Sequence, residues 1–234
     1  MQMSFIEENL KNVEQRIREA CIRSGRSRED VTLIVVSKTK PVSMIREVLD
    51  LGPRDFGENK PQELRDKCDV LPGDIRWHMI GNLQRNKVKY VTGRAVMIHS
   101  LGSAELAEQI EKESAKRGII MPCLVEVNMA HELSKEGIAP EDAMHFIRSI
   151  STLKHLRIEG LMTVAPYVED PEENRNVFRS LRHLAVDIDR ENIDNICMRH
   201  LSMGMTGDYE VAIEEGATMI RVGTGILGER NYQL

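Results

Sequence analysis

The fold class is decided by the stretch Val31-Thr32-Leu33-Ile34-Val35-Val36-Ser37-Lys38-Thr39-Lys40-Pro41. Residues 31–36 form an apolar run that is rich in β-branched side chains and too short for a helix, which predicts a buried strand. An open doubly wound sheet would normally carry a glycine-rich turn after this first strand. Residues 37–41 contain no glycine, so the stretch favours a closed barrel of parallel strands.

Short apolar runs alternate along the chain with longer segments that have helical spacing and capping signals. The eight predicted strands are Val31–Val36, Arg54–Phe56, Ile75–Ile80, Ala95–His99, Pro122–Asn128, Leu156–Met162, Met198–Met203 and Thr218–Val222. The predicted helices include Ser103–Arg117, Pro140–Ser151, Pro171–Arg190 and a short helix after Asp208 that stops at Gly216. Eight strand-then-helix units predict a single (β/α)8 TIM barrel, with residues 1–234 as one domain.

A further helix is predicted before the first strand. Ser4 and Glu7 have the spacing of a capping box, and apolar residues then recur every three or four positions from Ile6 to Cys21. The pattern ends near Gly25. The barrel is therefore expected to carry an extra N-terminal helix.

Composition and charge exclude several classes of protein. The longest apolar runs are far shorter than the roughly 20 residues that cross a bilayer, so no membrane span is expected. Residues 1–25 show helical spacing with early acids instead of a basic flank and an apolar block, which argues against a secretion signal. A formal net charge of −5 opposes general binding of nucleic acid, because that binding depends on Lys and Arg displacing counterions.

The cysteines indicate a reducing compartment. Cys21, Cys68, Cys123 and Cys197 stand far apart and form no C-x-x-C pair. This spacing argues against both a disulfide framework and a zinc cluster. We expect buried or free thiols in a cytoplasmic protein.

Polar residues follow or end the predicted strands, and this is the main indication of a binding site. In a parallel barrel the carboxyl ends of all strands meet at one mouth, where barrel enzymes keep their sites. The residues expected there are Lys38, Glu58 with Asn59, His78, His99, Asn128, Met162, Ser202, and Arg221 with Gly223 and Thr224.

Lys38 is the candidate nucleophile. The apolar run before it would carry the lysine to the mouth and partly desolvate it, and desolvation lowers a lysine's pKa and favours Schiff-base formation with an aldehyde. The alternative is a solvated lysine without a role. Lys40 is a competitor, because alternation along an extended segment places it on the same side as Lys38.

A phosphate cup is the second candidate feature. The sequence Arg221-Val222-Gly223-Thr224-Gly225 follows the eighth predicted strand, and barrels often bind phosphate after strands seven and eight. Ser202 lies at the end of the seventh. Arg221 would point into the mouth, where its guanidinium could donate to a ring nitrogen. The alternative for Arg221 is a salt bridge to a strand-end acid.

His78 has two interpretations. It is either a general base or ring-stacking neighbour at the site, or a buried histidine with satisfied hydrogen bonds. The basic stretch Gln84-Arg85-Asn86-Lys87-Val88-Lys89-Tyr90 has one aromatic residue, which indicates a solvated helix face and not a nucleic-acid surface.

Several segments together resemble the pyridoxal phosphate homeostasis protein family, which is similar to the barrel domain of fold-type III enzymes such as alanine racemase. The segments are 35–39, 56–59, 77–87, 159–162, 201–205 and 221–224, with Glu132, Lys135 and Gly137 between them. The resemblance implies pyridoxal 5'-phosphate as cofactor, with Lys38 as its Schiff-base lysine. It also implies that Ser202, Gly223 and Thr224 hold the phosphate, that Arg221 faces the pyridine nitrogen, and that Asn59, His78 and Asn128 line the pocket.

Two departures from the family pattern stand out. Thr206 occupies a position where family members usually carry serine, which keeps the hydroxyl. The segment Met129-Ala130-His131 replaces a smaller segment that contains serine and glycine.

The expected function is intracellular handling of pyridoxal phosphate without a dedicated reaction. A permanently charged arginine cannot protonate the ring nitrogen, and racemases with that arrangement add a tyrosine base from a second domain. The first alternative is an amino-acid racemase with Lys38 and His78 as its two bases. The second is an aldolase or sugar-phosphate barrel enzyme that uses Lys38 without the cofactor. Pyridoxal-phosphate-dependent apo-enzymes are the candidate partners, and a monomer or weak homodimer is expected.

Overall fold

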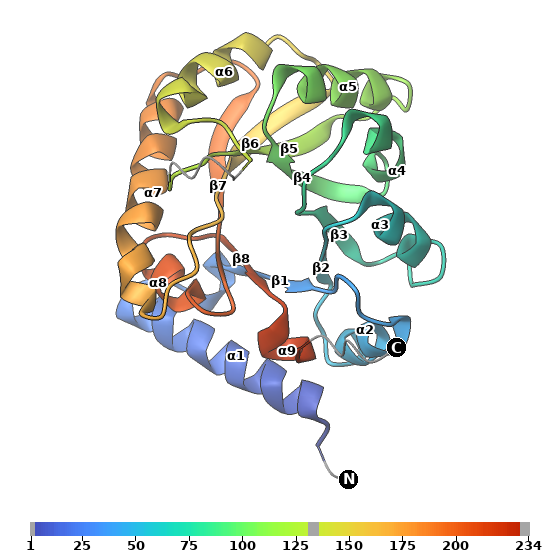
Figure 1. Cartoon of the computed structure of the whole chain (residues 1–234), viewed down its shortest axis with the longest axis vertical. Coiled ribbons are helices and arrows are strands. Elements are labelled where there is room, and N and C mark those ends of the chain that lie inside the picture. Colours follow the sequence, from blue (N-terminus) through green and yellow to red (C-terminus); the bar gives the residue numbers. More distant parts are fainter. Residues whose placement is uncertain (1–2, 131–135, 230–234) are drawn as a thin grey trace.

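Eight parallel strands close into a barrel. The computed structural model describes residues 3–130 and 136–229. The strands follow one another around the barrel in chain order, and β1 pairs with β8 to close it (Figure 1). They are β1 Thr32–Val36, β2 Asp55–Glu58, β3 Arg76–Met79, β4 Ala95–Leu101, β5 Met121–Glu126, β6 Leu156–Met162, β7 Ile196–Met205 and β8 Met219–Val222. The predicted barrel is confirmed.

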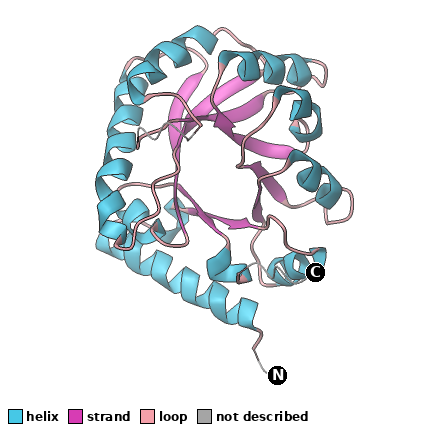
Figure 2. Cartoon of the chain, viewed as in Figure 1, coloured by secondary structure: helices cyan, strands magenta, loops and turns pink. Residues whose placement is uncertain are grey.

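Helices surround the strands on the outside (Figure 2). The α-helices are α1 Phe5–Arg23, α2 Val42–Asp50, α3 Pro61–Cys68, α4 Val88–Val91, α5 Ala104–Ala115, α6 Ala143–Ile150, α7 Arg175–Arg190, α8 Tyr209–Glu214 and α9 Thr224–Leu227. Single 3-10 turns lie at η1 Arg28–Asp30, η2 Arg85–Lys87, η3 Pro140–Asp142 and η4 Pro171–Asn174.

The extra N-terminal helix is also confirmed. Helix α1 begins after Ser4, whose side chain accepts a hydrogen bond from the backbone N–H of Glu7 over 3.1 Å. It lies outside the ring, along α8 and α9 (Figure 1). Its buried residues, from Ile6 to Cys21, follow the predicted spacing.

Strand alternation divides the core into two parts. Most buried apolar side chains, such as Val35 on β1 and Ile98 on β4, belong to the layer between the strands and the helices. A second cluster contains Ile34, Met97 and Leu124, each next in sequence to a residue of the first cluster. Because successive side chains of a strand point to opposite faces, this second cluster fills the inside of the barrel.

The predicted element boundaries need corrections. Predicted helices Pro140–Ser151 and Pro171–Arg190 each open with a 3-10 turn before the α-helix begins. The basic stretch 84–90 divides between η2 and the single-turn helix α4, and the cations of Arg65, Lys87 and Lys89 lie within 6 Å of the Tyr90 ring, at 5.1, 5.8 and 5.2 Å.

The described residues contain no helix that is both long and apolar enough to cross a membrane. All four cysteines are free thiols, and Cys21 and Cys123 are buried. No group of His, Cys, Asp or Glu suited to a metal ion occurs within residues 3–130 and 136–229.

Candidate functional site

A cavity of about 610 Å³ lies at the carboxyl ends of the strands. Residues that follow β1 and β2 contribute Lys38 and Asn59 to its lining. β8 contributes Arg221, and the residues that follow β7 and β8 contribute Thr206, Gly223 and Thr224. The cavity thus joins the candidate nucleophile to the candidate phosphate cup.

The structure separates Lys38 from Lys40. Residues 37–40 form a turn in which the backbone N–H of Lys40 donates to the carbonyl of Ser37, and Thr39 has a positive φ of 62°. The expected alternation is therefore wrong here, because it applies only to extended backbone. Lys38 lines the cavity, whereas the Lys40 ammonium donates to the carbonyl oxygens of Leu227 and Gly228, each over 2.8 Å.

A buried ionic cluster holds the backbone on both sides of Lys38. The ammonium of Lys67 donates to the carbonyl oxygen of Ser37 and to the carboxylates of Glu58 and Glu63, each over 2.7 Å. The backbone N–H of Thr39 also donates to Glu63, over 2.7 Å. Glu58 is fully buried and Lys67 is 6% exposed, so the cluster anchors the turn to the protein interior.

The cup after β7 and β8 is built from two threonines and a glycine. The hydroxyls of Thr206 and Thr224 lie 3.3 Å apart, and the N–H of Gly225 donates to the Thr206 hydroxyl over 3.4 Å. A Cβ at Gly225 would lie 3.0 Å from the methyl group of Thr206, so a larger residue would press on the cup. The hydroxyl of Thr206, known from the sequence only as a departure from a family pattern, belongs to the cavity lining.

Ser202 and His78 lie inside the barrel, outside the cavity lining. Arg221 donates to the hydroxyl of Ser202 over 2.6 Å, and that hydroxyl lies 2.9 Å from Nδ1 of His99. Nε2 of His99 lies 2.9 Å from Nδ1 of His78. Nε2 of His78 lies 3.0 Å from a carboxylate oxygen of Asp55. Four hydrogen bonds therefore connect Asp55 to Arg221, which does line the cavity.

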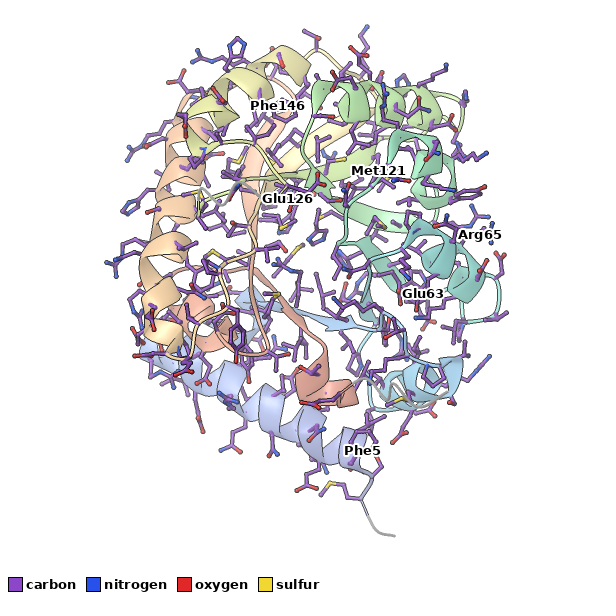
Figure 3. The ribbon with its side chains drawn as sticks, in the orientation of Figure 1. Phe5, Glu63, Arg65, Met121, Glu126 and Phe146 are labelled. Carbon is purple, nitrogen blue, oxygen red and sulfur yellow. The ribbon has the colours of Figure 1, made fainter. Side chains whose placement is uncertain are left out.

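Burial controls the charges at the mouth. It lowers the pKa of Arg221 to about 10, against the attraction of Glu126 and Asp208, so the guanidinium stays charged at neutral pH. Burial also raises the pKa of Glu126 to about 7, opposed by Arg221. Figure 3 shows Glu126 inside the ring of helices. Arg221 donates to the Thr163 carbonyl and to Ser202, and it forms no salt bridge within the described residues.

The two predicted asparagines differ in position. Asn59 lines the cavity, and its side-chain oxygen is a buried acceptor without a hydrogen-bond partner among the described residues. Asn128 follows β5, and its backbone N–H donates to the carbonyl of Ile138 over 2.9 Å. It is not part of the cavity lining. His131, Glu132 and Lys135 lie outside the described residues.

Comparisons with known proteins identify the family of this chain. A family model described as alanine racemase, N-terminal domain, matches residues 6–231. The pyridoxal phosphate homeostasis protein of Aquifex aeolicus is 45% identical over 226 residues, which cover 96% of this chain and 98% of that protein.

Two solved structures share both fold and sequence. A protein of unknown function from Bifidobacterium adolescentis has a TM-score of 0.91 at 36% identity and covers 95% of this chain and 94% of that one. PipY of Synechococcus elongatus, solved with pyridoxal phosphate bound, has a TM-score of 0.79 at 34% identity and covers 92% of this chain and 100% of that one. The chain therefore belongs to the alanine racemase N-terminal domain family and, within it, to the pyridoxal phosphate homeostasis proteins.

Proposed function

We propose that the protein binds pyridoxal 5'-phosphate in the mouth cavity, as a Schiff base on Lys38, and serves vitamin B6 homeostasis without a dedicated reaction. The observation that carries this proposal is the position of the two lysines. Lys38 lines the same cavity as the hydroxyl cup, while Lys40 donates to three backbone carbonyls, of Leu227 at the end of α9 and of Gly228 and Glu229 after it. The relative PipY, whose structure contains pyridoxal phosphate, supports the choice of ligand.

The residues present fit this cofactor. The hydroxyls of Thr206 and Thr224, with Gly223 between β8 and α9, would hold the phosphate. A Cβ at Gly223 would lie 3.3 Å from the side chain of Val36, so a larger residue would crowd the cup. The buried side-chain oxygen of Asn59, which has no partner in residues 3–130 and 136–229, offers an acceptor for a donor group of the ligand.

Arg221 supports a carrier more than an enzyme. Bound pyridoxal phosphate supplies an electron sink, which works best when a carboxylic acid protonates the ring nitrogen. Arg221 lines the cavity as a charged donor, so it would hydrogen-bond to the nitrogen and oppose its protonation. The electron sink would then be weak.

The racemase alternative needs a second base beside Lys38, and His78 does not meet that need. Both ring nitrogens of His78 are engaged, one with His99 and one with Asp55, and the side chain is 3% exposed. A general base must reach the proton that it removes. An amino-acid racemization assay on cofactor-loaded protein is expected to show no turnover.

The first experiment is an absorbance spectrum of purified protein with added pyridoxal phosphate, followed by borohydride reduction and peptide mass mapping. We expect a visible band that disappears in Lys38→Ala, remains in the matched variant Lys40→Ala, and maps to Lys38. An adduct on Lys40 would reassign the nucleophile. A colourless unmodified protein would overturn the proposal and favour a sugar-phosphate barrel enzyme.

Transfer of the cofactor to apo-enzymes is the finer part of the proposal. Loaded protein would be mixed with a pyridoxal-phosphate-dependent apo-enzyme, and recovery of its activity would be followed in time. Faster recovery than from free cofactor at equal concentration supports delivery. Slower recovery supports sequestration from the free pool.

A further inference from the structure

A line of buried polar side chains runs through the barrel and ends at both of its mouths. Asp55 begins β2 and lines a second cavity, of about 350 Å³, at the amino ends of the strands. Arg221 lines the cavity at the carboxyl ends. Between them lie His78, His99 and Ser202, which are at most 3% exposed. The four hydrogen bonds that join these five residues measure 2.6–3.0 Å.

The chemistry of the two ends restricts the direction of these hydrogen bonds. Arginine has only donors, and an ionised carboxylate has only acceptors. Burial alone would raise the pKa of Asp55, but hydrogen bonds from Arg76 and His78 lower it below its usual value, so the carboxylate is ionised at neutral pH. Arg221, at one end of the line, must therefore donate, and Asp55, at the other end, must accept.

One proton arrangement satisfies every member while both imidazoles are neutral. His78 donates from Nε2 to Asp55, so its Nδ1 must accept from Nε2 of His99. Nδ1 of His99 then accepts from the hydroxyl of Ser202. That hydroxyl in turn accepts from Arg221.

The surroundings of His99 favour its neutral form. Burial lowers the pKa of His99 well below its usual value, and the positive charge of the buried Arg221 lowers it further. Arg76 also forms an ion pair with the Asp55 carboxylate at the end of the line.

We propose that Asp55, His78, His99 and Ser202 are positioning residues that act through this one-way line of hydrogen bonds to orient Arg221 toward the pyridine nitrogen of bound cofactor. The proposal rests on the proposed function, because it assigns a role toward pyridoxal phosphate. Ser202 engages one terminal nitrogen of Arg221 and the Thr163 carbonyl engages the other, so the plane of the guanidinium is fixed. The remaining N–H donors are then available to the cavity that Arg221 lines.

This role for Ser202 differs from that of a phosphate ligand. The Ser202 side chain is fully buried and absent from the cavity lining, and both of its hydrogen bonds stay within the barrel. The hydroxyls at the cup belong to Thr206 and Thr224. Ser202 therefore reaches the ligand only through Arg221.

The first test measures the histidine tautomers directly. Nitrogen-15 NMR of the imidazoles, in unmodified protein without cofactor and at neutral pH, is expected to show both His78 and His99 protonated on Nε2 only. A proton on Nδ1 of His99, or a charged His78, would overturn the proposed direction. This measurement does not depend on the cofactor or on any variant.

The second test compares two ligands in the Ser202→Ala variant. Pyridoxal phosphate and its carbocyclic analogue, which has carbon in place of the pyridine nitrogen, are titrated by absorbance. Unmodified protein is expected to prefer pyridoxal phosphate, and Ser202→Ala to weaken that ligand by about 5- to 10-fold, the effect of one hydrogen bond. Binding of the analogue is expected to stay unchanged.

Glu159→Gln provides the matched control. Glu159 is 6% exposed and lies on β6. It lines the same second cavity as Asp55 and is not part of the line. We expect this variant to bind both ligands as unmodified protein does. Equal weakening of both ligands by Ser202→Ala, or no weakening, would overturn the positioning role. Failure of unmodified protein to form any adduct would instead overturn the proposed function, and the tautomer measurement would still decide the direction of the line.

Discussion

The ammonium of Lys67 lies 2.7 Å from the carbonyl oxygen of Ser37, the residue directly before Lys38. The same ammonium pairs with Glu58 and Glu63, and Glu63 also accepts from the N–H of Thr39. Both neighbours of Lys38 are thereby tied to one cluster. Lys38 lines the cavity, whereas the charged groups that hold its backbone neighbours do not.

Lys67→Met is expected to destabilise the protein strongly. The change leaves Glu58 as a fully buried carboxylate without its cation, and breaking a buried pair from one side costs about 3–5 kcal/mol. Urea denaturation measures the loss of unfolding free energy. The control is Lys11→Met, whose ion pair with Glu7 is exposed and is expected to contribute less than about 0.5 kcal/mol. Equal effects of the two variants would contradict the assigned role of Lys67.

Thr206→Val should reduce the preference for a phosphorylated ligand. The substitution keeps the shape of the side chain but removes the hydroxyl that lines the cup, and a hydrogen bond to a charged group contributes about 1.5–3 kcal/mol. We therefore expect the ratio of affinities for pyridoxal phosphate and pyridoxal to fall by about 10-fold or more, as measured by absorbance titration.

Ser202→Ala is the comparison for this experiment. Because Ser202 lies behind Arg221, its loss should weaken both pyridine ligands alike and leave the preference for phosphate intact. A loss of phosphate preference in Ser202→Ala, with none in Thr206→Val, would restore Ser202 as the phosphate residue that the family resemblance implied.

The barrel could be predicted from the sequence because most strands carry their own apolar signal, although β2, Asp55–Glu58, has Phe56 as its one large apolar residue. The position of side chains at the strand ends could not, because it depends on a few backbone angles. The predicted seventh strand stopped at Met203, whereas β7 continues to Met205 through a register shift, with Gly204 at a φ of 90°. The first residue beyond this strand is therefore Thr206, and Ser202 points into the barrel.

The turn at Lys38 shows the same limit. The left-handed backbone of Thr39 cannot be inferred from alternation, and it is what separates Lys38 from Lys40. In contrast, the sequence contains a signal for the position of His78. It stands between Trp77 and Met79, which both pack in the outer core, so strand periodicity alone directs His78 into the barrel.

Gly160→Ala is expected to prevent folding. Gly160 lies in β6 at a φ of 152°, and a Cβ there would lie 1.8 Å from the carbonyl oxygen of His200 on β7. Two paired strands would have to separate to make room. The measurement is the yield of soluble protein and its thermal transition, and Gly73→Ala, with no atom within 4 Å of the added Cβ, is expected to behave as unmodified protein. A folded Gly160→Ala protein of normal stability would contradict the close approach of β6 and β7.

Glu126→Gln is expected to change how stability depends on pH. Burial raises the pKa of Glu126 to about 7 in the folded protein, while an unfolded chain titrates this group at about 4.3. The folded state therefore binds the proton more tightly, and the stability that this group contributes is fully present below about pH 4.3 and is lost as the pH rises through about 7.

Glutamine does not ionise, so the variant does not lose stability in this way as the pH rises. Its stability relative to unmodified protein should rise by about 2 kcal/mol between pH 5 and pH 9, from about 1.4 kcal/mol for each pKa unit with a reduction for solvent screening. Chemical denaturation at a series of pH values gives this difference. Glu105→Gln, at an exposed position in the first turn of α5, should show no such rise, because the Glu105 pKa is lowered by hydrogen bonds from its own backbone and from Ser103. Parallel stability curves for Glu126→Gln and unmodified protein would mean that Glu126 is ionised at no cost beside Arg221.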